Sequence, residues 1–406
     1  MSGVLKAGIR ILLVHSADEA YGSDRVLVSV AEYLCQTHAQ VRALLPDDTS
    51  PGWLTDRLTE MGVEVRRGPL AVARRRYLNK GNLPTYVIDV SRARRFVKTQ
   101  IHAFDPEVVY LNTSALIVGG LLGRRRRWSM IWHVHEIIEH PRWLARLFRS
   151  LPLTADQVVA VSDAVVRHLC GNAGHSGRVT LLRNGIAPRA LQAKPSLPPL
   201  RVCFAGRLSE WKGYQVFLDA AIQLAAHDEP IDFVIAGDPL PNEGWRIEEI
   251  QSAVAGRALS SRIQAIGFHP NIPELFDSVH VVVVPSILPD PLPTVVLEGM
   301  RSGSVVIAAR HGGAVEMIED GVSGFLVTPG DAESLQRAIL RVLADPGLID
   351  DIGVAASTRV ASEFTTEVFW QNLSSVFSRA IDLASSRRRR DDCKAGPSVS
   401  ISMPRA

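Results

Sequence analysis

Short apolar runs alternate with amphipathic segments along most of the chain, and this alternation constrains the fold more than any other feature. In the first half, the apolar runs with the length of buried strands are residues 9–14, 41–45, 63–66, 108–111, 130–134 and 158–161. The segments between them, such as 85–102 and 164–170, space their apolar residues as helices do. Repeated strand–helix units predict a parallel sheet covered by helices on both faces.

A proline-rich break divides this pattern in two. Residues 191–200 contain three prolines and little periodicity, which predicts a linker. The apolar runs that follow it are residues 201–205, 231–236, 263–267, 279–285 and 305–309. Because 406 residues exceed what a single core usually holds, we expect two doubly wound, Rossmann-like α/β domains. In such a fold, ligand binds in a cleft between the domains, at the carboxyl ends of the strands.

The boundaries follow from the same pattern. We predict a first domain over residues 1–190, a linker over 191–200 and a second domain over 201–365. A helix over 366–386 follows. We expect residues 387–406, which are charged and contain Ser and Pro, to be disordered because they offer little to bury.

Charge is distributed unevenly around a formal net charge of +3. Residues 1–199 carry 27 Lys and Arg against 16 Asp and Glu, whereas residues 200–386 carry 12 against 24. The first half holds three arginine clusters, at residues 74–76, at residues 124–127 and at Arg92, Arg94 and Arg95. This favours docking to anionic lipid headgroups or to a lipid-diphosphate acceptor, at about 1 kcal/mol for each basic residue. Nucleic acid ranks lower as a partner because no recognition motif or aromatic interleaving accompanies the arginines.

Other features exclude several classes of protein. No apolar run approaches the ~18 residues of a membrane span, and the N-terminus does not resemble a secretory signal. The four cysteines, Cys35, Cys170, Cys203 and Cys393, lack metal or redox spacing. We therefore expect a cytoplasmic protein with reduced thiols.

The segment Asp290-Pro-Leu-Pro-Thr-Val-Val-Leu-Glu298 follows one apolar run and precedes another. It places two carboxylates eight positions apart, the first in a proline-rich loop and the second where a helix is expected to open. Carboxylates accept hydrogen bonds from sugar hydroxyls, and the free amides at a helix start hold anions. The segment therefore predicts a nucleotide-sugar pocket at the carboxyl edge of a parallel sheet.

Two glycine-containing segments follow other predicted strands. Gly206-Arg-Leu-Ser-Glu-Trp-Lys-Gly213 combines a glycine turn, a helix start and two cations, Arg207 and Lys212, which suits a diphosphate. In His311-Gly-Gly-Ala-Val-Glu316, the glycines permit close approach of the backbone to a ligand.

Two segments of the first half also carry polar groups at predicted strand ends. Tyr21-Gly-Ser-Asp-Arg25 lies between the first strand and the first helix, and Asp24 is a plausible helix cap. In Trp132-His-Val-His-Glu136, strand alternation puts both histidines on one face. The H-x-H-E pattern invites a metal site, but no third ligand at useful spacing accompanies it.

Together these segments resemble the retaining glycosyltransferases of family 4, which have the GT-B fold. The resemblance covers most of residues 9–385 and is strongest over 201–330. This chain has Asp290 where the family usually has Glu, and Leu292-Pro293-Thr294 where Phe-Gly-x is usual. It also has Ser23 where a second glycine would follow Gly22.

The resemblance implies transfer of a sugar from a nucleoside-diphosphate sugar to a hydroxyl acceptor, with retained anomeric configuration and without a metal or other cofactor. It also implies a last helix that crosses back to the first domain. The residues that it places at the donor are Gly22, Ser23, Gly206, Arg207, Lys212, Gly237, Phe268, Asp290, Leu292, Pro293, Thr294 and Glu298.

Among these residues, the resemblance gives individual roles to some. Arg207 and Lys212 would hold the diphosphate, Glu298 the ribose, and Asp290 the donor sugar. His135, with His133 as second choice, would contact the sugar. The family also suggests surface-glycan assembly on a lipid-linked or polysaccharide acceptor at the inner membrane face. Two alternatives stay open: a nucleotide-sugar epimerase with the same fold, and a catalytically silent binding protein, which the Asp290 and Ser23 departures motivate.

Overall fold

The computed structural model describes residues 6–74, 83–123, 126–139, 141–171, 179–239 and 243–395. The chain divides into two compact units, one of residues 1–161, 166–182 and 370–406, the other of residues 162–165 and 183–369. The division therefore falls after Leu182, earlier than the predicted boundary at 190, and the stretch 191–200 is part of the second unit. Lys194 shows why: its Nζ donates to Phe276 O and Ser304 Oγ, each at 2.8 Å, and so ties this stretch down.

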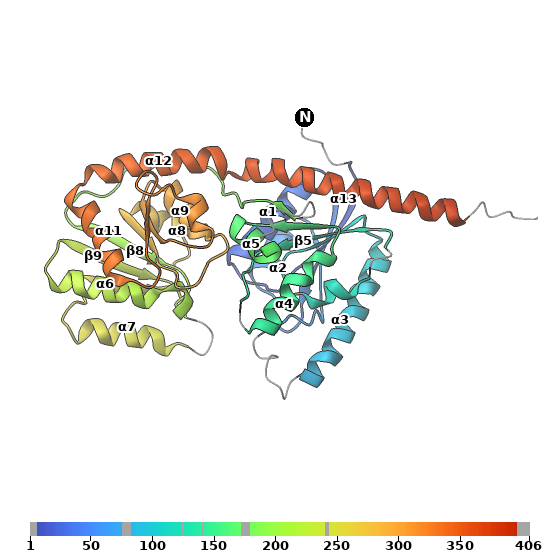
Figure 1. The fold of residues 1–406 in the computed structure, drawn as a ribbon, viewed down its shortest axis with the longest axis horizontal. Helices are drawn as coiled ribbons and strands as arrows, with labels where there is room; N and C mark the ends of the chain where they lie inside the picture. The colour runs from blue at the N-terminus through green and yellow to red at the C-terminus, as the bar shows by residue number, and fades with distance from the viewer. Residues whose placement is uncertain are drawn as a thin grey trace, which may run out of the picture. The chain divides into compact units, whose positions relative to one another are not determined.

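The first unit is built on a seven-stranded parallel sheet in the order β3-β2-β1-β4-β5-β6-β7. Figure 1 labels its strand β5. Its strands are β1 (Arg10–Val14), β2 (Gln40–Pro46), β3 (Glu64–Gly68), β4 (Val108–Leu111), β5 (Ser129–Val134), β6 (Gln157–Ala160) and β7 (Val179–Leu181). The first six were predicted, whereas β7 is only three residues long and has no periodicity to detect.

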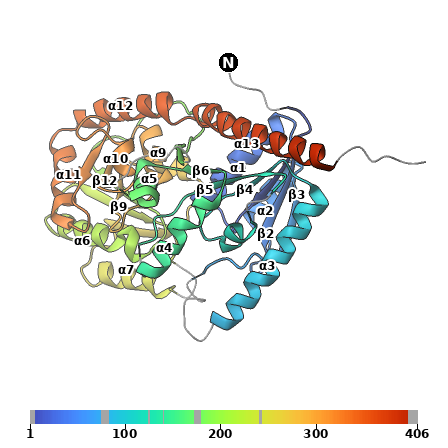
Figure 2. The ribbon, with the colours of Figure 1, turned by 45° about the vertical axis from the view of Figure 1, so that its right-hand side comes forward.

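The helices of this unit follow its strands. They are α1 (Gly22–Gln36), α2 (Trp53–Glu60), α3 (Leu83–Phe104), α4 (Arg142–Ser150), α5 (Asp163–Cys170) and two 3₁₀ helices, η3 (Ile117–Leu121) and η4 (Pro152–Thr154). Contacts tie α2 both to α1 and to the edge strand β3, and Figure 2 shows these elements together. The first turn of α5 is counted with the second unit.

The second unit is built on a six-stranded parallel sheet in the order β10-β9-β8-β11-β12-β13. Its strands are β8 (Leu200–Ala205), β9 (Ile231–Ala236), β10 (Ile263–Gly267), β11 (Val281–Val284), β12 (Val305–Ala309) and β13 (Phe325–Val327). Its helices are η6 (Glu210–Lys212), α6 (Tyr214–Ala226), α7 (Trp245–Ala255), α8 (Ile272–Asp277), α9 (Thr294–Arg301), α10 (Ala314–Met317), α11 (Ala332–Ala344) and α12 (Gly347–Glu363).

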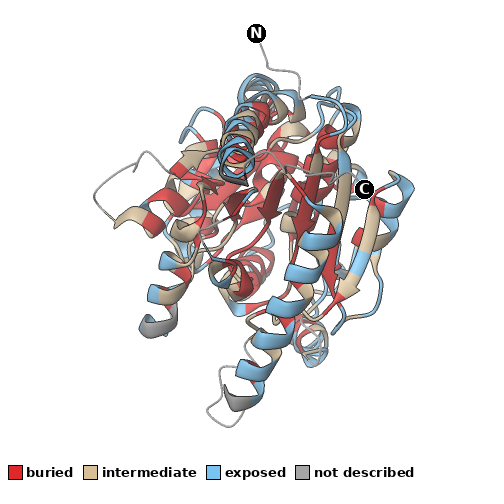
Figure 3. Cartoon of the chain, turned by 90° about the vertical axis from the view of Figure 1, so that its right-hand side faces the viewer, coloured by how far each residue is buried: buried red, intermediate tan, exposed pale blue. Residues whose placement is uncertain are grey.

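The prediction of two doubly wound parallel sheets is confirmed. In each sheet the strand order reverses beside the first strand, because β1 lies between β2 and β4 and β8 lies between β9 and β11. The central strands β11 and β12 are buried along their whole length, and Figure 3 shows the buried residues concentrated in the strands. In open α/β sheets, ligands bind beside the strand carboxyl ends where the order reverses. The loops after β1, β4, β8 and β11 are thus where each unit offers a site.

Helix α13 (Thr366–Ala395) ends the described chain, and from Trp370 onward it belongs to the first unit. Trp370 Nε1 donates to Ser29 O of α1 at 2.9 Å. The disorder that we predicted from residue 387 is wrong as far as Ala395, because the charged residues there find partners. Arg387 donates to both carboxylate oxygens of Asp156, at 2.7 and 3.0 Å. Residues 396–406 lie outside the described chain.

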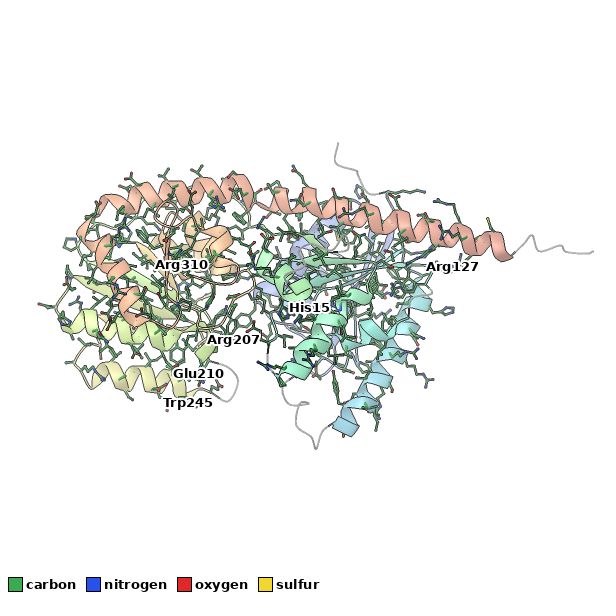
Figure 4. All side chains as sticks on the ribbon, in the orientation of Figure 1. His15, Arg127, Arg207, Glu210, Trp245 and Arg310 are labelled. Carbon is green, nitrogen blue, oxygen red and sulfur yellow. The ribbon has the colours of Figure 1, made fainter. Side chains whose placement is uncertain are left out.

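Several arginines of the predicted clusters are engaged inside the first unit. Arg74 pairs with Asp48, and the side chain of Arg126, only 3% exposed, pairs with Asp156 at 2.9 Å. Arg127 lies beside α13 (Figure 4) and pairs with Asp392 at 2.7 Å. Residues 75, 76, 124 and 125 lie outside the described part of the chain. Within that part, no helix combines the length and apolarity that crossing a membrane requires.

Candidate active site

In the second unit, an ion pair and a backbone hydrogen bond, from Ile287 N to Trp211 O at 2.7 Å, join the loops after β8 and β11. Lys212, at the end of η6, donates from Nζ to the carboxylate of Asp290, and the two side chains are 22% and 12% exposed. The Lys212 ammonium also lies 4.3 Å from the centre of the Trp211 ring. The structure thus brings together the two residues that the sequence predicted for diphosphate and sugar. Each compensates the other's charge.

Glycines make this loop arrangement possible. A Cβ on Gly312, whose φ is +60°, would lie 2.2 Å from Asp290 O, and the N–H of Gly313 donates to the same oxygen at 2.8 Å. On the other side, a Cβ on Gly213 would lie 2.0 Å from Pro285 O. The glycines of the 311–316 segment therefore admit the Asp290 loop, whereas the sequence had suggested close approach to a ligand.

The backbone is packed just as closely at the carboxyl ends of β8, β9 and β10. Gly206 N donates to Ala236 O at 3.0 Å, and Gly237 N donates to Gly267 O at 2.7 Å. A Cβ on Gly237 would lie 1.9 Å from Gly206 O. Phe268 follows directly, 56% exposed, with its N–H donating to Asp238 Oδ1 at 3.0 Å. These predicted residues form one continuous edge beside Arg207, which is half-buried (labelled in Figure 4).

Helix α9 carries the second predicted carboxylate. Glu298 is 9% exposed and lies one turn inside the helix, which begins at Thr294 with Pro293 as its N-cap residue. The expectation that Glu298 opens the helix is therefore wrong. The residues at the opening are Pro293 and Thr294, preceded by the buried Leu292. The amides of a first helical turn lack acceptors within the helix, so this start suits anionic or hydroxyl ligands.

In the first unit, the predicted residues Gly22 and Ser23 open helix α1. Asp24 follows them and is 1% exposed. Its Oδ2 accepts from the Tyr21 N–H at 3.2 Å, which bears out part of the capping prediction. Its Oδ1 lies 2.7 Å from Nε2 of the fully buried His15, the residue directly after β1.

A buried polar chain continues from His15 to the predicted His135. Asn112, the residue after β4, places Nδ2 3.2 Å from His15 Nδ1 and 2.9 Å from Ser23 O. Its Oδ1 lies 3.0 Å from His135 Nε2. Burial lowers the pKa of His135 well below its ordinary value, and the neighbouring His133 and His15 lower it further. His135 therefore stays neutral at neutral pH.

His133, the second choice, lies deeper. It is fully buried, its Nδ1 is hydrogen-bonded to Tyr110 Oη, and burial lowers its pKa to about 3. The rings of His133 and His135 are 4.0 Å apart between centres. Glu136, in turn, is engaged by a neighbouring loop: it accepts from Thr113 Oγ1 and from the N–H and Oγ of Ser114, the latter two at 3.0 and 2.8 Å.

These contacts bear on the H-x-H-E pattern. Among the described residues, no three His, Cys, Asp or Glu side chains are arranged to hold a metal ion. Both carboxylate oxygens of Glu136 instead accept hydrogen bonds from the loop after β4. Sequence reasoning missed His15 and Asn112, although each is a polar residue placed directly after an apolar strand, and it assigned Asp24 only a cap.

The comparisons with known proteins agree with this geometry. Residues 192–359 match the family described as glycosyl transferases group 1, and residues 22–185 match the glycosyl transferase 4-like domain. The lipopolysaccharide 1,2-N-acetylglucosaminetransferase of Salmonella typhimurium is 30% identical over 297 residues, which cover 69% of this chain and 74% of that protein. The chain belongs to the group 1 glycosyltransferases.

Other members of this family match over shorter stretches. The amylovoran biosynthesis glycosyltransferase AmsK of Erwinia amylovora is 26% identical, and the alpha-D-kanosaminyltransferase of Streptomyces kanamyceticus is 28% identical. The alignment with AmsK covers 60% of each chain. The alignment with the kanosaminyltransferase covers 43% of this chain and 45% of the relative. The chain thus spans about three-fifths of the length of AmsK and under half of the length of the kanosaminyltransferase.

Solved structures with the same fold cover nearly the whole chain. The Anabaena HepE protein in complex with UDP-glucose has a TM-score of 0.75 at 22% identity, over 91% of this chain and 100% of the other. Sucrose-phosphate synthase from Thermosynechococcus elongatus has a TM-score of 0.75 at 20% identity, over 91% and 98%. Both confirm the GT-B fold of this group 1 family member.

Proposed function

We propose that this protein is a retaining glycosyltransferase that moves a sugar from a nucleoside-diphosphate sugar to a hydroxyl of a lipid-linked or polysaccharide acceptor in surface-glycan biosynthesis. Relatives named for amylovoran, lipopolysaccharide and colanic acid biosynthesis support the surface-glycan role. A structural neighbour in complex with UDP-glucose supports the class of donor.

The observation that carries the proposal is the Lys212–Asp290 pair at the point where the second sheet reverses its strand order. A cation, a carboxylate and the start of α9 follow neighbouring strands β8 and β11. This set matches the three parts of a nucleoside-diphosphate sugar, because the diphosphate needs positive charge and amides while the sugar hydroxyls need acceptors.

In this proposal each residue has one task. Lys212 and Arg207 stabilise the negative charge that develops on the leaving diphosphate. Glu298 accepts hydrogen bonds from the ribose hydroxyls. Asp290, with the backbone N–H groups of Leu292 and Thr294, holds the donor sugar, and His135 contacts a sugar hydroxyl as a neutral imidazole. The two cations supply the charge that a metal would otherwise provide, and the donor phosphate takes the acceptor proton.

The buried location of the additional titratable groups argues against an epimerase. His15 and Asp24 are 0% and 1% exposed and pair with each other. A general acid or base must come within hydrogen-bonding reach of the substrate proton, and these two groups are enclosed by protein. Their arrangement suits a supporting role behind His135.

A donor screen tests the proposal. We expect one nucleoside-diphosphate sugar to raise the melting temperature, with a stabilisation of RT ln(1 + [L]/Kd). Lys212→Ala and Glu298→Ala should abolish the shift, while Lys6→Ala, in the first unit, should leave it unchanged. Anomeric configuration is then read by NMR on the product of the best donor. No shift with any donor would favour a silent binding protein, and an isomerised donor formed without acceptor would favour an epimerase.

Peripheral association with the inner membrane face is part of the proposal, and we infer that the contact is made by α3. Arg74, Arg126 and Arg127 have acidic partners within the unit. Helix α3 presents the exposed Arg94, Arg95 and Lys98, together with Arg92, which pairs with Asp89 at 3.5 Å but is still exposed. The same helix carries Val87 and Ile88, which are 60% and 54% exposed. Basic and apolar residues together on one exposed helix suit an anionic lipid surface.

Liposome flotation tests this part separately. Vesicles with about one-third anionic lipid should retain the protein, and reversal of Arg92 and Arg95 to Glu should release it, at about 1 kcal/mol per basic residue. Reversal of Arg257, on the loop after α7 in the second unit, is the matched control and should leave binding unchanged. Equal retention of all three proteins would overturn the membrane assignment while leaving the donor site untouched.

A further inference from the structure

The chain of polar side chains behind His135 has a fixed direction. Ser23 O is a carbonyl oxygen and only accepts hydrogen bonds, so the Asn112 atom 2.9 Å from it is the amide nitrogen. The same nitrogen lies 3.2 Å from His15 Nδ1, which must therefore accept. His15 then carries its proton on Nε2 and donates to the Asp24 carboxylate at 2.7 Å.

The other end of the same amide determines the state of His135. With its nitrogen directed to Ser23 O and His15, Asn112 presents Oδ1 to His135 Nε2 at 3.0 Å. A carbonyl oxygen accepts, so Nε2 of His135 carries a proton. Because the ring is neutral, its other nitrogen, Nδ1, is left with a lone pair. Among the residues that the structure describes, none is hydrogen-bonded to His135 Nδ1, and the residue is only partly buried.

We propose that Asp24, His15 and Asn112 are positioning residues that lock His135 in the Nε2–H tautomer, so that Nδ1 accepts a hydrogen bond from a hydroxyl of the bound sugar. The inference deepens the proposed function and, in its second half, rests on it. The other tautomer would present an N–H to the substrate, and it would set the Nε2 lone pair against Asn112 Oδ1. A partner that holds the second ring nitrogen is the ordinary way to select a histidine tautomer.

A merely structural role for these residues makes a different prediction. Asp24 also accepts from the Tyr21 N–H at the start of α1, so its loss would lower stability in either case. Only the positioning role links the residues that follow β1 and β4, and Asp24 of α1, to the protonation of one ring nitrogen of His135. The decisive readout is therefore the tautomer itself.

The full chain labelled with ¹⁵N-histidine allows that readout, because two-bond proton–nitrogen couplings separate the two neutral tautomers and the charged ring. The chain has 12 histidines, and the spectrum of His135→Gln identifies the signals of His135. We expect Nε2–H, unchanged from about pH 6 to pH 8, the range in which an ordinary histidine changes charge. A charged ring or an Nδ1–H tautomer in the wild-type protein overturns the proposal whether or not the enzyme is active.

Two substitutions at Asn112 then test the lock. Asn112→Leu removes the acceptor at the same side-chain size, and we expect a mixture of tautomers and a fivefold to tenfold fall in kcat/KM, about the worth of one hydrogen bond. Asn112→Asp keeps an acceptor toward His135, so we expect the Nε2–H tautomer to persist and activity to recover in part. An unchanged tautomer in Asn112→Leu would show that the chain does not set it.

Tyr110→Phe is the matched control, since it removes a buried hydroxyl bonded to His133 without touching a member of the chain. This variant should lose stability but keep the His135 tautomer and kcat/KM.

Failure of the proposed function would give a different result. In that case the tautomer responds to Asn112→Leu as expected, yet no donor is turned over, and the hydroxyl acceptor role of Nδ1 is withdrawn.

Discussion

Replacing Asp290 by Asn should change the binding of a nucleoside diphosphate and of its sugar conjugate in opposite directions. The substitution keeps the size of the side chain and removes its charge. In the free protein that charge is paired with Lys212, and both side chains are largely buried, at 12% and 22% exposed. The amide oxygen of the variant can still accept from the Lys212 ammonium, but the neutral side chain no longer compensates the positive charge.

The magnitudes follow from these two roles. An uncompensated Lys212 attracts a diphosphate more strongly, and we estimate a gain of about 1 kcal/mol, or roughly fivefold in Kd. Loss of a carboxylate as acceptor for a sugar hydroxyl costs about 1.5–3 kcal/mol, which is roughly tenfold to 150-fold. The ratio of the two dissociation constants removes the Lys212 contribution, because that contribution acts on both ligands. The ratio should therefore shift by the full tenfold or more.

Isothermal titration with the nucleoside diphosphate and with its sugar conjugate measures this ratio. Asp320→Asn is the matched control, because it neutralises a carboxylate that is paired with Arg310 in the same unit, and it should leave both constants unchanged. A ratio that moves less than about twofold would refute the sugar contact. A parallel loss for both ligands would mean that Asp290 serves only to hold Lys212.

Three further predictions test other parts of the structure. Asp156→Asn should lower the free energy of unfolding by about 3–5 kcal/mol, because the buried Arg126 would lose the negative charge of Asp156. Arg387→Met should lower it by about 1.5–3 kcal/mol, and Arg389→Met, at an exposed position, should change it by no more than about 0.5 kcal/mol. Equal losses in urea melts for all three would contradict the ranking. Gly312→Ala and Gly321→Ala both place a side chain at positive φ, +60° and +78°, but only the first meets other atoms, among them Asp290 O at 2.2 Å. Gly321→Ala should therefore lose about 1 kcal/mol of stability, whereas Gly312→Ala should lose more and should also weaken donor binding. Finally, burial lowers the pKa of Lys194 from 10.5 to about 8. Between these values the unfolded chain binds more protons, so stability should rise with pH by about 1–3 kcal/mol, and Lys194→Met should lack that rise; the same rise in both proteins would assign it to other groups.

Much of the fold could be predicted because the strands of a parallel sheet are buried on both faces. Continuous runs such as Val281–Val284 therefore stand out against their surroundings. Where a strand is short, as in β7, the pattern carries no such signal. The prediction of disorder from residue 387 was wrong because the residue types there are misleading. A run of arginines is typical of a solvated tail, but here Arg387 pairs with Asp156 and Arg388 pairs with Asp105, both of the first unit.

For the candidate site, the sequence indicated the residues but not which of them contact one another. Lys212 and Asp290 were both predicted, since each belongs to a motif with its own chemical meaning, but nothing in the spacing indicated that they pair with each other. The glycines at 312 and 313 were expected to permit close approach of the backbone to a ligand, and the group that approaches them is the Asp290 backbone. His15 and Asn112 escaped notice because a single polar residue after a strand is common in any α/β protein.

The sequence by itself determined the class of fold, the two parallel sheets and the residue types gathered at their carboxyl edges. Buried strands and polar loops can each be recognised from a short stretch of residues. Only the tertiary structure decided which of those residues face one another. Asp24, His15, Asn112 and His135 come from four separate stretches of the chain. Their common direction of hydrogen bonding depends on atoms that folding brings within about 3 Å, a distance that no spacing along the chain encodes.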